Sequence, residues 1–332
     1  MSVWLEGLRR VGRAPMILAG VWAMTVLVAM PLTLSLRDAL TEHLGASLAA
    51  DRAAGGVDYD WMQEFGDVAT GPAVTFKPTI LGFGAVLDNL SAFLDATTRP
   101  IAIVAVASAY VLLWIFLAGG ILDRYARDRA TRADGFFSVC GVFFFRFARL
   151  AAVQLIVYVF LFTSMHAWLF DRLYPNLIRD LTVERTAFLI RLALYVVFGV
   201  VLAGCNLLFD YAKVRAVIED RRSVLGAIVA AARFIGRNYA AVVTFYLLNV
   251  ALFVIVLAVY AAVAPGAGAT GVSMWAGFLV SQVYIAARLW VKLAFWASEI
   301  ALFQDRLAHA GYVARPEPVW PDSPAADAIR EI

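Results

Sequence analysis

Charged residues are scarce in this chain of 332 residues, and their scarcity excludes a large soluble domain. Asp, Glu, Lys and Arg together make up 16% of the sequence, whereas hydrophobic residues make up 62% and the mean hydropathy is +0.78. Soluble domains contain roughly 25% charged residues, so this composition is typical of a membrane protein. The apolar runs are continuous and do not alternate, which excludes strands of the porin type and predicts an all-α fold.

Cysteine and histidine are also rare. The two cysteines, Cys140 and Cys205, exclude a disulfide framework, and we expect both to be reduced thiols. The three histidines, His43, His166 and His309, have no carboxylate or thiol at the spacing of a metal site, so we expect no metal and no other cofactor. The motifs of hydrolases, zinc proteases and phosphate-binding loops do not occur, which leaves an enzymatic site without support. A net charge of only +3 gives no reason to expect nucleic acid as a partner.

Six apolar runs are long enough to cross a bilayer, which requires about 20 residues in a helix. With their connections, these runs form a predicted membrane domain over residues 1–308. The tail 309–332 contains Pro316, Pro318, Pro321 and Pro324, and we expect it to be disordered. The six runs cover residues 15–36, 101–122, 149–170, 187–208, 239–263 and 272–303.

The distribution of Lys and Arg predicts the orientation. Cations concentrate in the N-terminal segment and in the connections 123–148 and 209–238, whereas the connection 37–100 has nine acidic residues and only four basic ones. The short connection 264–271 has no charge. Because basic loops stay in the cytoplasm, we predict a multi-pass protein of the inner (plasma) membrane with both termini cytoplasmic.

The longer connections have helical patterns of their own. In 37–100, a leucine stripe predicts that the first helix continues outward, and 79–94 reads as an interfacial helix and not as a seventh span. The connection as a whole is expected to be a small helical outer loop. The connections 123–148 and 209–238 each hold apolar residues with Arg at the far end, and we predict two amphipathic elbow helices along the inner leaflet. Two ordinary, positively charged loops are the alternative.

The last run contains two cations and a carboxylate: Arg288, Lys292 and Glu299. Four residues turn a helix by about 400° and seven by about 700°, so the three side chains share one face. In one interpretation, the cations extend to lipid headgroups near the membrane boundary. In the other, the stripe faces the bundle and forms an intramembrane polar network. For Arg288 we predict a bonded acceptor, with Asp210, Asn206 and Asn249 as the leading candidates. The polar residues expected at similar depth are Gln154, Asn206, Asp210 and Asn249.

Three segments carry a resemblance to known proteins: "FLAGGILDRYARDR" (116–129), "FFFRFARL" (143–150) and "FDYAKVRAVIEDRRSVLGAIVAAARFIGRN" (209–238). They resemble a group of bacterial six-span integral membrane proteins and, more loosely, the membrane domains of some glycerophosphoryl diester phosphodiesterases. The soluble phosphodiesterase domain and its metal-binding residues are not in this sequence. The resemblance implies an inner-membrane location and no defined activity.

Two functions fit these observations. The first is a non-enzymatic scaffold or lipid-interacting component of the cell envelope, with membrane lipids, further copies of the chain or an envelope protein as partners. The second is a transporter or permease subunit for a small anionic or amphipathic solute that passes the Arg288 stripe. An intramembrane enzyme ranks third. Fold and topology alone do not choose between these classes.

Overall fold

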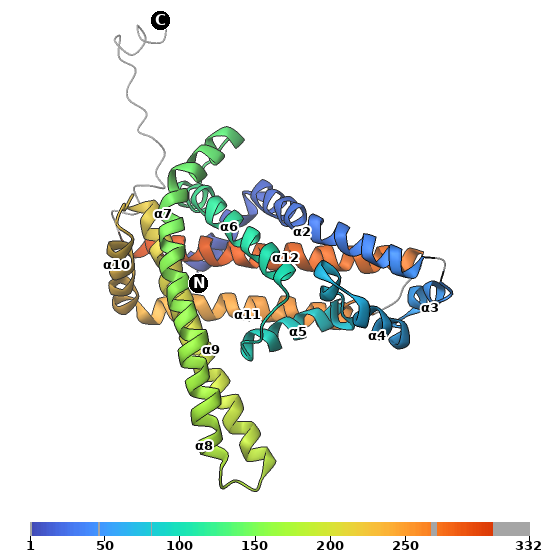
Figure 1. The fold of residues 1–332 in the computed structure, drawn as a ribbon. Coiled ribbons are helices and arrows are strands. Elements are labelled where there is room, and N and C mark those ends of the chain that lie inside the picture. The colour runs from blue at the N-terminus through green and yellow to red at the C-terminus, as the bar shows by residue number, and fades with distance from the viewer. Residues whose placement is uncertain (1, 46, 81, 267–270, 308–332) are drawn as a thin grey trace, which may run out of the picture.

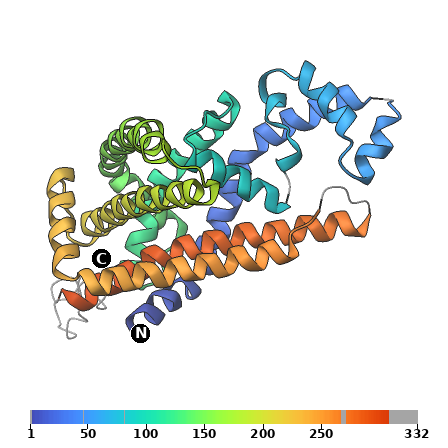
Figure 2. The same cartoon turned by 90° about the horizontal axis from the view of Figure 1, so that it is seen from below.

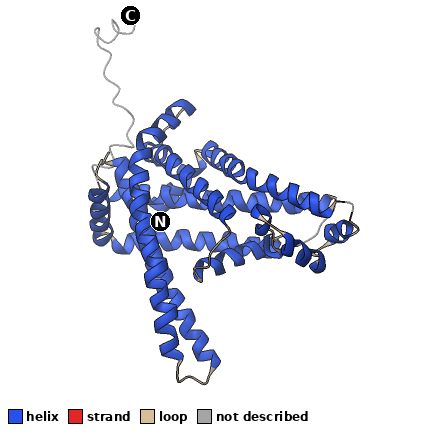
Figure 3. Ribbon diagram, viewed as in Figure 1, coloured by secondary structure: helices blue, strands red, loops and turns tan. Residues whose placement is uncertain are grey.

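A computed structural model describes residues 2–45, 47–80, 82–266 and 271–307. In these residues all regular structure is helical, which confirms the all-α prediction (Figure 3). The predicted tail 309–332 and His309 lie outside the described residues. The helices are α1 (Ser2–Gly12), α2 (Pro15–Leu44), α3 (Ala49–Gly55), α4 (Tyr59–Val68), η1 (Gly71–Thr75), η2 (Pro78–Ile80), α5 (Gly82–Leu94), α6 (Ile101–Arg127), α7 (Ala133–Phe160), η3 (Leu161–Met165), η4 (Trp168–Leu173), α8 (Tyr174–Ile178), α9 (Glu184–Ile218), α10 (Val224–Arg237), α11 (Tyr239–Val263) and α12 (Val272–Arg306).

Six helical segments of the described chain are long and apolar enough to cross a membrane. Each contains one of the six predicted runs, so the number and order of the spans are confirmed. Large apolar side chains along them remain exposed, such as Leu155, Ile156 and Val200. An apolar surface of that extent is typical of helices that face lipid. The segments are α2, α6, α7 to α8 (Ala133–Ile178), α9, α11 and α12.

The helix α5 has 13 residues, which is about 20 Å at 1.5 Å per residue. The hydrocarbon layer of a bilayer is roughly 30 Å thick, so α5 is too short to cross it. This agrees with the prediction that 79–94 is not a seventh span.

The long helices α11 and α12 run side by side in opposite directions, and α2 lies next to α12 (Figures 1 and 2). At one end of this group, α10 lies across the ends of α11 and α12. The helices α3, α4 and α5 gather at the opposite end. The pair formed by α7 and α9 leaves the group and extends away from α11 and α12 (Figure 1). The main core lies where α1, α6, α9 and α12 meet, with Ile121, Tyr125, Tyr211 and Phe303 fully buried.

The connection 37–100 is helical, as predicted. The helix α2 continues to Leu44, and the helices after it enclose a small aromatic cluster of His43, Trp61, Phe65 and Phe76. The indole Nε1 of Trp61 donates to His43 Nδ1 at 3.1 Å. The contacts in this cluster hold the end of α2 against α4 and Phe76.

The prediction of a separate elbow helix in the connection 123–148 is wrong. Instead, α7 begins at Ala133 and continues without interruption to Phe160, so only residues 128–132 connect it to α6. The reason is close packing against α6. A Cβ at Gly119 would lie 2.7 Å from Phe143 Cβ, and one at Gly120 would lie 2.6 Å from Cys140 Sγ. The two glycines let the first half of α7 pack directly on α6.

The second elbow is a helix of its own. Ser223 caps α10 by accepting a hydrogen bond from the amide of Gly226 at 3.2 Å, and Asn238 separates α10 from α11. The helix buries small side chains and Phe234 against its neighbours, whereas Leu225 and Val229 are exposed. Its position along a leaflet stays a prediction.

Candidate functional site

An open groove of about 720 Å³ lies between α6, α7, α9, α11 and α12. We call it the central groove. Five of the seven residues that the sequence placed in a polar network line it, and Glu299 and Asn249 do not. The five are Gln154, Asn206, Asp210, Arg288 and Lys292.

Helical spacing explains how the groove acquires its lining. Residues three or four apart lie on the same face of a helix, and four of the five helices present such a pair from neighbouring turns. The pairs are Tyr110 and Trp114 on α6, Gln154 and Tyr158 on α7, Asp210 and Lys213 on α9, and Arg288 and Lys292 on α12. Tyr246 on α11 completes the polar part of the lining.

Among the described residues, Asp210 is the only acidic one that lines the groove, and its carboxylate accepts several hydrogen bonds. Lys213 Nζ donates to Oδ1 at 2.8 Å, and Trp296 Nε1 donates to the same oxygen at 3.2 Å. Asn206 Nδ2 donates to Oδ2 at 3.1 Å. A buried carboxylate is tolerated when its oxygens accept several hydrogen bonds and a cation lies beside it. These bonds therefore hold the Asp210 carboxylate in place at the α9 side of the groove.

Lys292 has a different environment. Its Nζ lies 3.4 Å from the centroid of a Trp114 ring and 5.7 Å from the Tyr110 centroid. No carboxylate of the described residues forms an ion pair with it. Aromatic faces stabilise a cation through the ring quadrupole, but they do not neutralise its charge. Among the described residues, Lys292 therefore has aromatic rings and no paired carboxylate beside it at the wall of the groove.

The acceptor predicted for Arg288 is not found. Arg288 is exposed and forms no hydrogen bond or ion pair with any described residue, so that prediction is wrong. The three expected acceptors bond to other partners. Asp210 and Asn206 bond to each other, and Asn249 accepts from Trp4 Nε1 at 3.0 Å and donates to Ser298 Oγ at 2.8 Å.

Glu299 lies in the core beside the groove and not in its lining. Its side chain is buried, and neither carboxyl oxygen has a hydrogen-bond partner within the described part of the chain. The stripe predicted on α12 is thus divided. Arg288 and Lys292 face the groove, whereas Glu299 faces packed helices.

The charges of the groove do not balance. In the described part of the chain, three basic side chains line it, namely Lys213, Arg288 and Lys292, against the single carboxylate of Asp210. Two apolar residues at its edge are exposed, Val111 at 53% and Leu155 at 64%. Such a groove attracts an anion and offers an apolar surface next to it. In the described residues, no group of three or more His, Cys, Asp or Glu side chains could hold a metal ion.

Several groove residues were not predicted as part of a site. Lys213 counted only among the cations of the connection 209–238, and Trp296 was not assigned to the network. The spacing of Asp210 and Lys213, three residues apart at the end of an apolar run, was the signal in the sequence that could have placed Lys213 beside Asp210. The aromatic residues Tyr110, Tyr158 and Tyr246 gave no signal, because tyrosine is common in membrane spans.

No family model matches this sequence, and comparison with curated proteins and with solved structures found no match. The geometry of the groove is therefore the basis for a functional assignment.

Proposed function

We propose that this protein is a non-enzymatic, lipid-interacting component of the bacterial inner membrane, and that its central groove binds an anionic lipid. The observation that carries the proposal is the pair Arg288 and Lys292. Both cations lie within a span, and neither has an acidic partner among the described residues.

An anionic headgroup fits this pair for energetic reasons. A cation near the middle of a span costs roughly 2.5 to 3.5 kcal/mol on insertion scales, and pairing with an anion offsets that cost. A guanidinium group binds phosphate through two parallel hydrogen bonds, which favours a phosphate headgroup at Arg288. The exposed apolar side chains of Val111 and Leu155 at the edge would then contact the acyl chains.

The charge pattern suggests which leaflet supplies the lipid. Asp210 lies about 12 Å along α9 from Ile218, at the end that the positive-inside rule assigns to the cytoplasm. In this orientation both termini are cytoplasmic and the groove opens to the inner leaflet. The Arg-rich connection that contains α10 would lie at the same membrane surface.

Native mass spectrometry from a mild detergent tests the proposal. We expect the purified protein to retain an anionic phospholipid, and the double variant Arg288→Gln/Lys292→Met to lose one retained lipid. Arg179→Gln removes a charge outside the groove and is the control. Retention of zwitterionic lipid alone, or equal retention by the double variant, would contradict the proposal.

A transporter or permease subunit for an anionic solute is the second candidate, and one feature favours it. The third span contains two π-helical stretches, Leu161–Met165 and Trp168–Leu173. Such stretches are frequent at functional sites, and interrupted spans are common in transporters. A soluble anion retained in place of a lipid, with flux of that anion into proteoliposomes, would support this function instead.

A further inference from the structure

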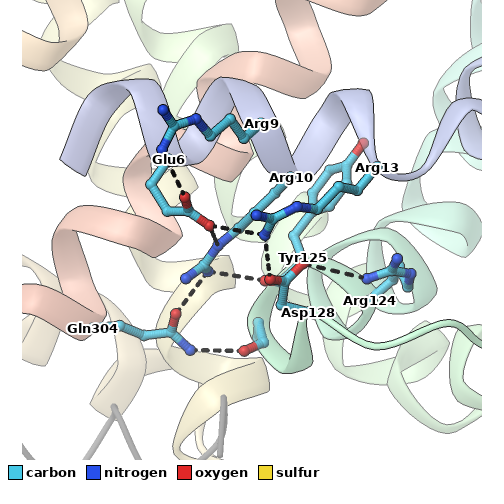
Figure 4. Close-up of polar contacts among 9 residues, drawn as sticks. Glu6, Arg9, Arg10, Arg13, Arg124, Tyr125, Asp128 and Gln304 are labelled. Atoms are coloured by element: carbon cyan, nitrogen blue, oxygen red, sulfur yellow. Dashed lines mark hydrogen bonds and ion pairs between the residues drawn. The ribbon is translucent and has the colours of Figure 1, made fainter. Parts of the chain in front are cut away.

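The N-terminal helix α1 packs on α12 and forms a polar network with the end of α6 (Figure 4). Arg10 is buried, and its Nη1 donates to the backbone carbonyl of Tyr125 at 2.9 Å and to Gln304 Oε1 at 2.7 Å. Gln304 Nε2 donates to the carbonyl of Ala126 at 2.8 Å. Burial lowers the pKa of Arg10, and the negative charges of Asp128 and Glu6 act against that effect. The network fixes α1 to both α6 and α12.

Beside this network, two arginines share one carboxylate. Arg13 Nη1 donates to Asp128 Oδ2 at 2.8 Å, and Arg124 Nη1 lies 3.8 Å from Asp128 Oδ1 (Figure 4). The Arg124 side chain is only 11% exposed, and its Nη1 has no hydrogen-bond partner among the described residues. Asp128 Oδ1 also has no such partner. Within the described residues, Arg124 Nη1 therefore lacks the short hydrogen bond that a buried guanidinium normally forms.

The charges around Arg124 are unequal. Among the described residues, the ion pairs of this network join Arg9, Arg10, Arg13 and Arg124 to the two carboxylates of Glu6 and Asp128, so the arginines exceed the carboxylates by two (Figure 4). An anion placed beside Arg13 and Arg124 would reduce this excess. It would also supply the missing acceptor for Arg124 Nη1.

A crevice of about 430 Å³ begins at these two arginines and runs along the first turns of α2. Its other walls come from the end of α6 and the start of α7. Met16, Ile17 and Met24 line the α2 side, and Phe136 and Phe137 line the α7 side. Met16 is 80% exposed, so the crevice is open along the surface of a span. None of its lining residues lines the central groove.

We propose that this crevice, which we call the α2 crevice, binds an anionic phospholipid, with its phosphate between Arg13 and Arg124 and one acyl chain along Met16, Ile17 and Met24. A lipid accounts for both parts of the site, because a free phosphate would leave the apolar wall without a partner. The site is independent of the central groove.

Photo-crosslinking of the full-length protein in mild detergent tests the proposal. The probe is phosphatidylglycerol with a diazirine in its acyl chain, used below the protein concentration, and phosphatidylcholine with the same acyl chain is its comparison. We expect the phosphatidylglycerol probe to label peptides that contain residues 16–24 and 136–137. Labelling by the phosphatidylcholine probe should be about tenfold weaker, because it lacks net negative charge.

Two variants test the charged part and the apolar part of the site separately. Arg13→Gln/Arg124→Gln removes the charges, and we expect labelling to fall about tenfold. Gly20→Leu fills the crevice without changing any charge, because Gly20 lines it and a Cβ at this position has no atom within 4 Å. We expect Gly20→Leu to reduce labelling although the protein stays folded. The controls are Arg179→Gln and Gly199→Leu, since a Cβ at Gly199 also meets nothing within 4 Å.

Three results would overturn the proposal: equal labelling by both probes, unchanged labelling in Gly20→Leu, or displacement of the probe by an equal concentration of inorganic phosphate. The last result would identify a site for a free anion. The central groove is tested by its own variant, Arg288→Gln/Lys292→Met, so failure at one site is distinguishable from failure at the other.

Discussion

Asp210 and Glu299 are buried carboxyl groups on neighbouring helices, and their surroundings differ. Asp210 accepts three hydrogen bonds from side chains, one of them from the Lys213 ammonium group. Glu299 accepts none from the described residues. An unpaired buried charge costs several kcal/mol, whereas a satisfied one costs much less. Replacing the carboxylate by an amide should therefore lower the stability of the protein at Asp210 but not at Glu299.

We expect Glu299→Gln to unfold at the same temperature as the wild type or at a higher one. Glutamine has nearly the same size as glutamate and places no charge in the core. We expect Asp210→Asn, the matched control, to lose about 3 to 5 kcal/mol of stability, because Lys213 then lacks its partner. Thermal unfolding in detergent compares the two variants. A decrease for Glu299→Gln as large as that for Asp210→Asn would contradict this account.

Individual residues of the site were only partly predictable from the sequence. The position of Arg288 and Lys292 on one face follows from helical geometry, which is a local property. The acceptors of Arg288 were predicted wrongly, because Asn249 bonds to Trp4, a residue 245 positions away. Contacts between distant segments depend on how the helices pack, and the periodicity within one helix gives no information about that packing.

Among the helices, α1 makes one very close approach to α12, in addition to its polar contacts. A Cβ at Gly7 would lie 2.5 Å from Ser298 Cα and 2.7 Å from Ser298 N, both of which belong to the α12 backbone. Backbone atoms cannot move aside as a flexible side chain can. The contact of α1 with α12 therefore requires glycine at position 7.

We predict that Gly7→Ala displaces α1 from α12 at a cost of about 1 to 3 kcal/mol. The amides of α1 should then exchange faster with solvent, which hydrogen exchange measures. Gly12→Ala is the matched control in the same helix, because a Cβ at Gly12 meets no atom within 4 Å. Equal exchange in Gly7→Ala and Gly12→Ala would show that the close approach does not hold α1 in place.

The helix α10 presents Leu225 and Val229 outward and buries Ala227 and Ala231. We predict that it lies parallel to the membrane surface with the exposed pair in the lipid. Spin labels at 225 and 229 should report the same depth and high accessibility to oxygen. A label at 222 should report access to a water-soluble nickel complex. High nickel accessibility at 225 and 229 would place α10 in water.

The elements were more predictable than the residues of the site. Each span follows from the length of an apolar run, and that length is read directly from the chain. The first elbow was predicted wrongly, because Gly119 and Gly120 of α6 allow the segment after Ala133 to pack as part of α7. The same glycines are also compatible with a separate elbow helix. Only the packing of α7 on α6 in the structure shows that the segment after Ala133 belongs to α7.

At the scale of the whole molecule, opposite ends differ in composition. The helix α10 and its Arg-rich flanks lie at one end, and the acidic connection with α3, α4 and α5 lies at the other (Figure 1). From this separation, the positive-inside rule predicts that the end with α10 faces the cytoplasm.

We predict that Asp60 faces the periplasmic side and Arg222 the cytoplasmic side. In a background with Cys140→Ala and Cys205→Ala, a thiol reagent that cannot cross the membrane should label Asp60→Cys in intact spheroplasts. It should label Arg222→Cys only after the membrane is permeabilised. The reverse pattern would invert the orientation and place the groove in the other leaflet.

The central groove lies between α6, α7, α9, α11 and α12, and the excess of basic over acidic residues in its lining is the reason to assign it to an anionic lipid. The most direct test is a titration by native mass spectrometry with phosphatidylglycerol and with phosphatidylcholine, in a Gly20→Leu background that closes the α2 crevice. We predict that the Kd for phosphatidylglycerol is about tenfold lower, as a charge-assisted pair implies, and that Arg288→Gln/Lys292→Met abolishes this preference. Equal Kd values for the two lipids, or a preference that survives in the double variant, would contradict the account.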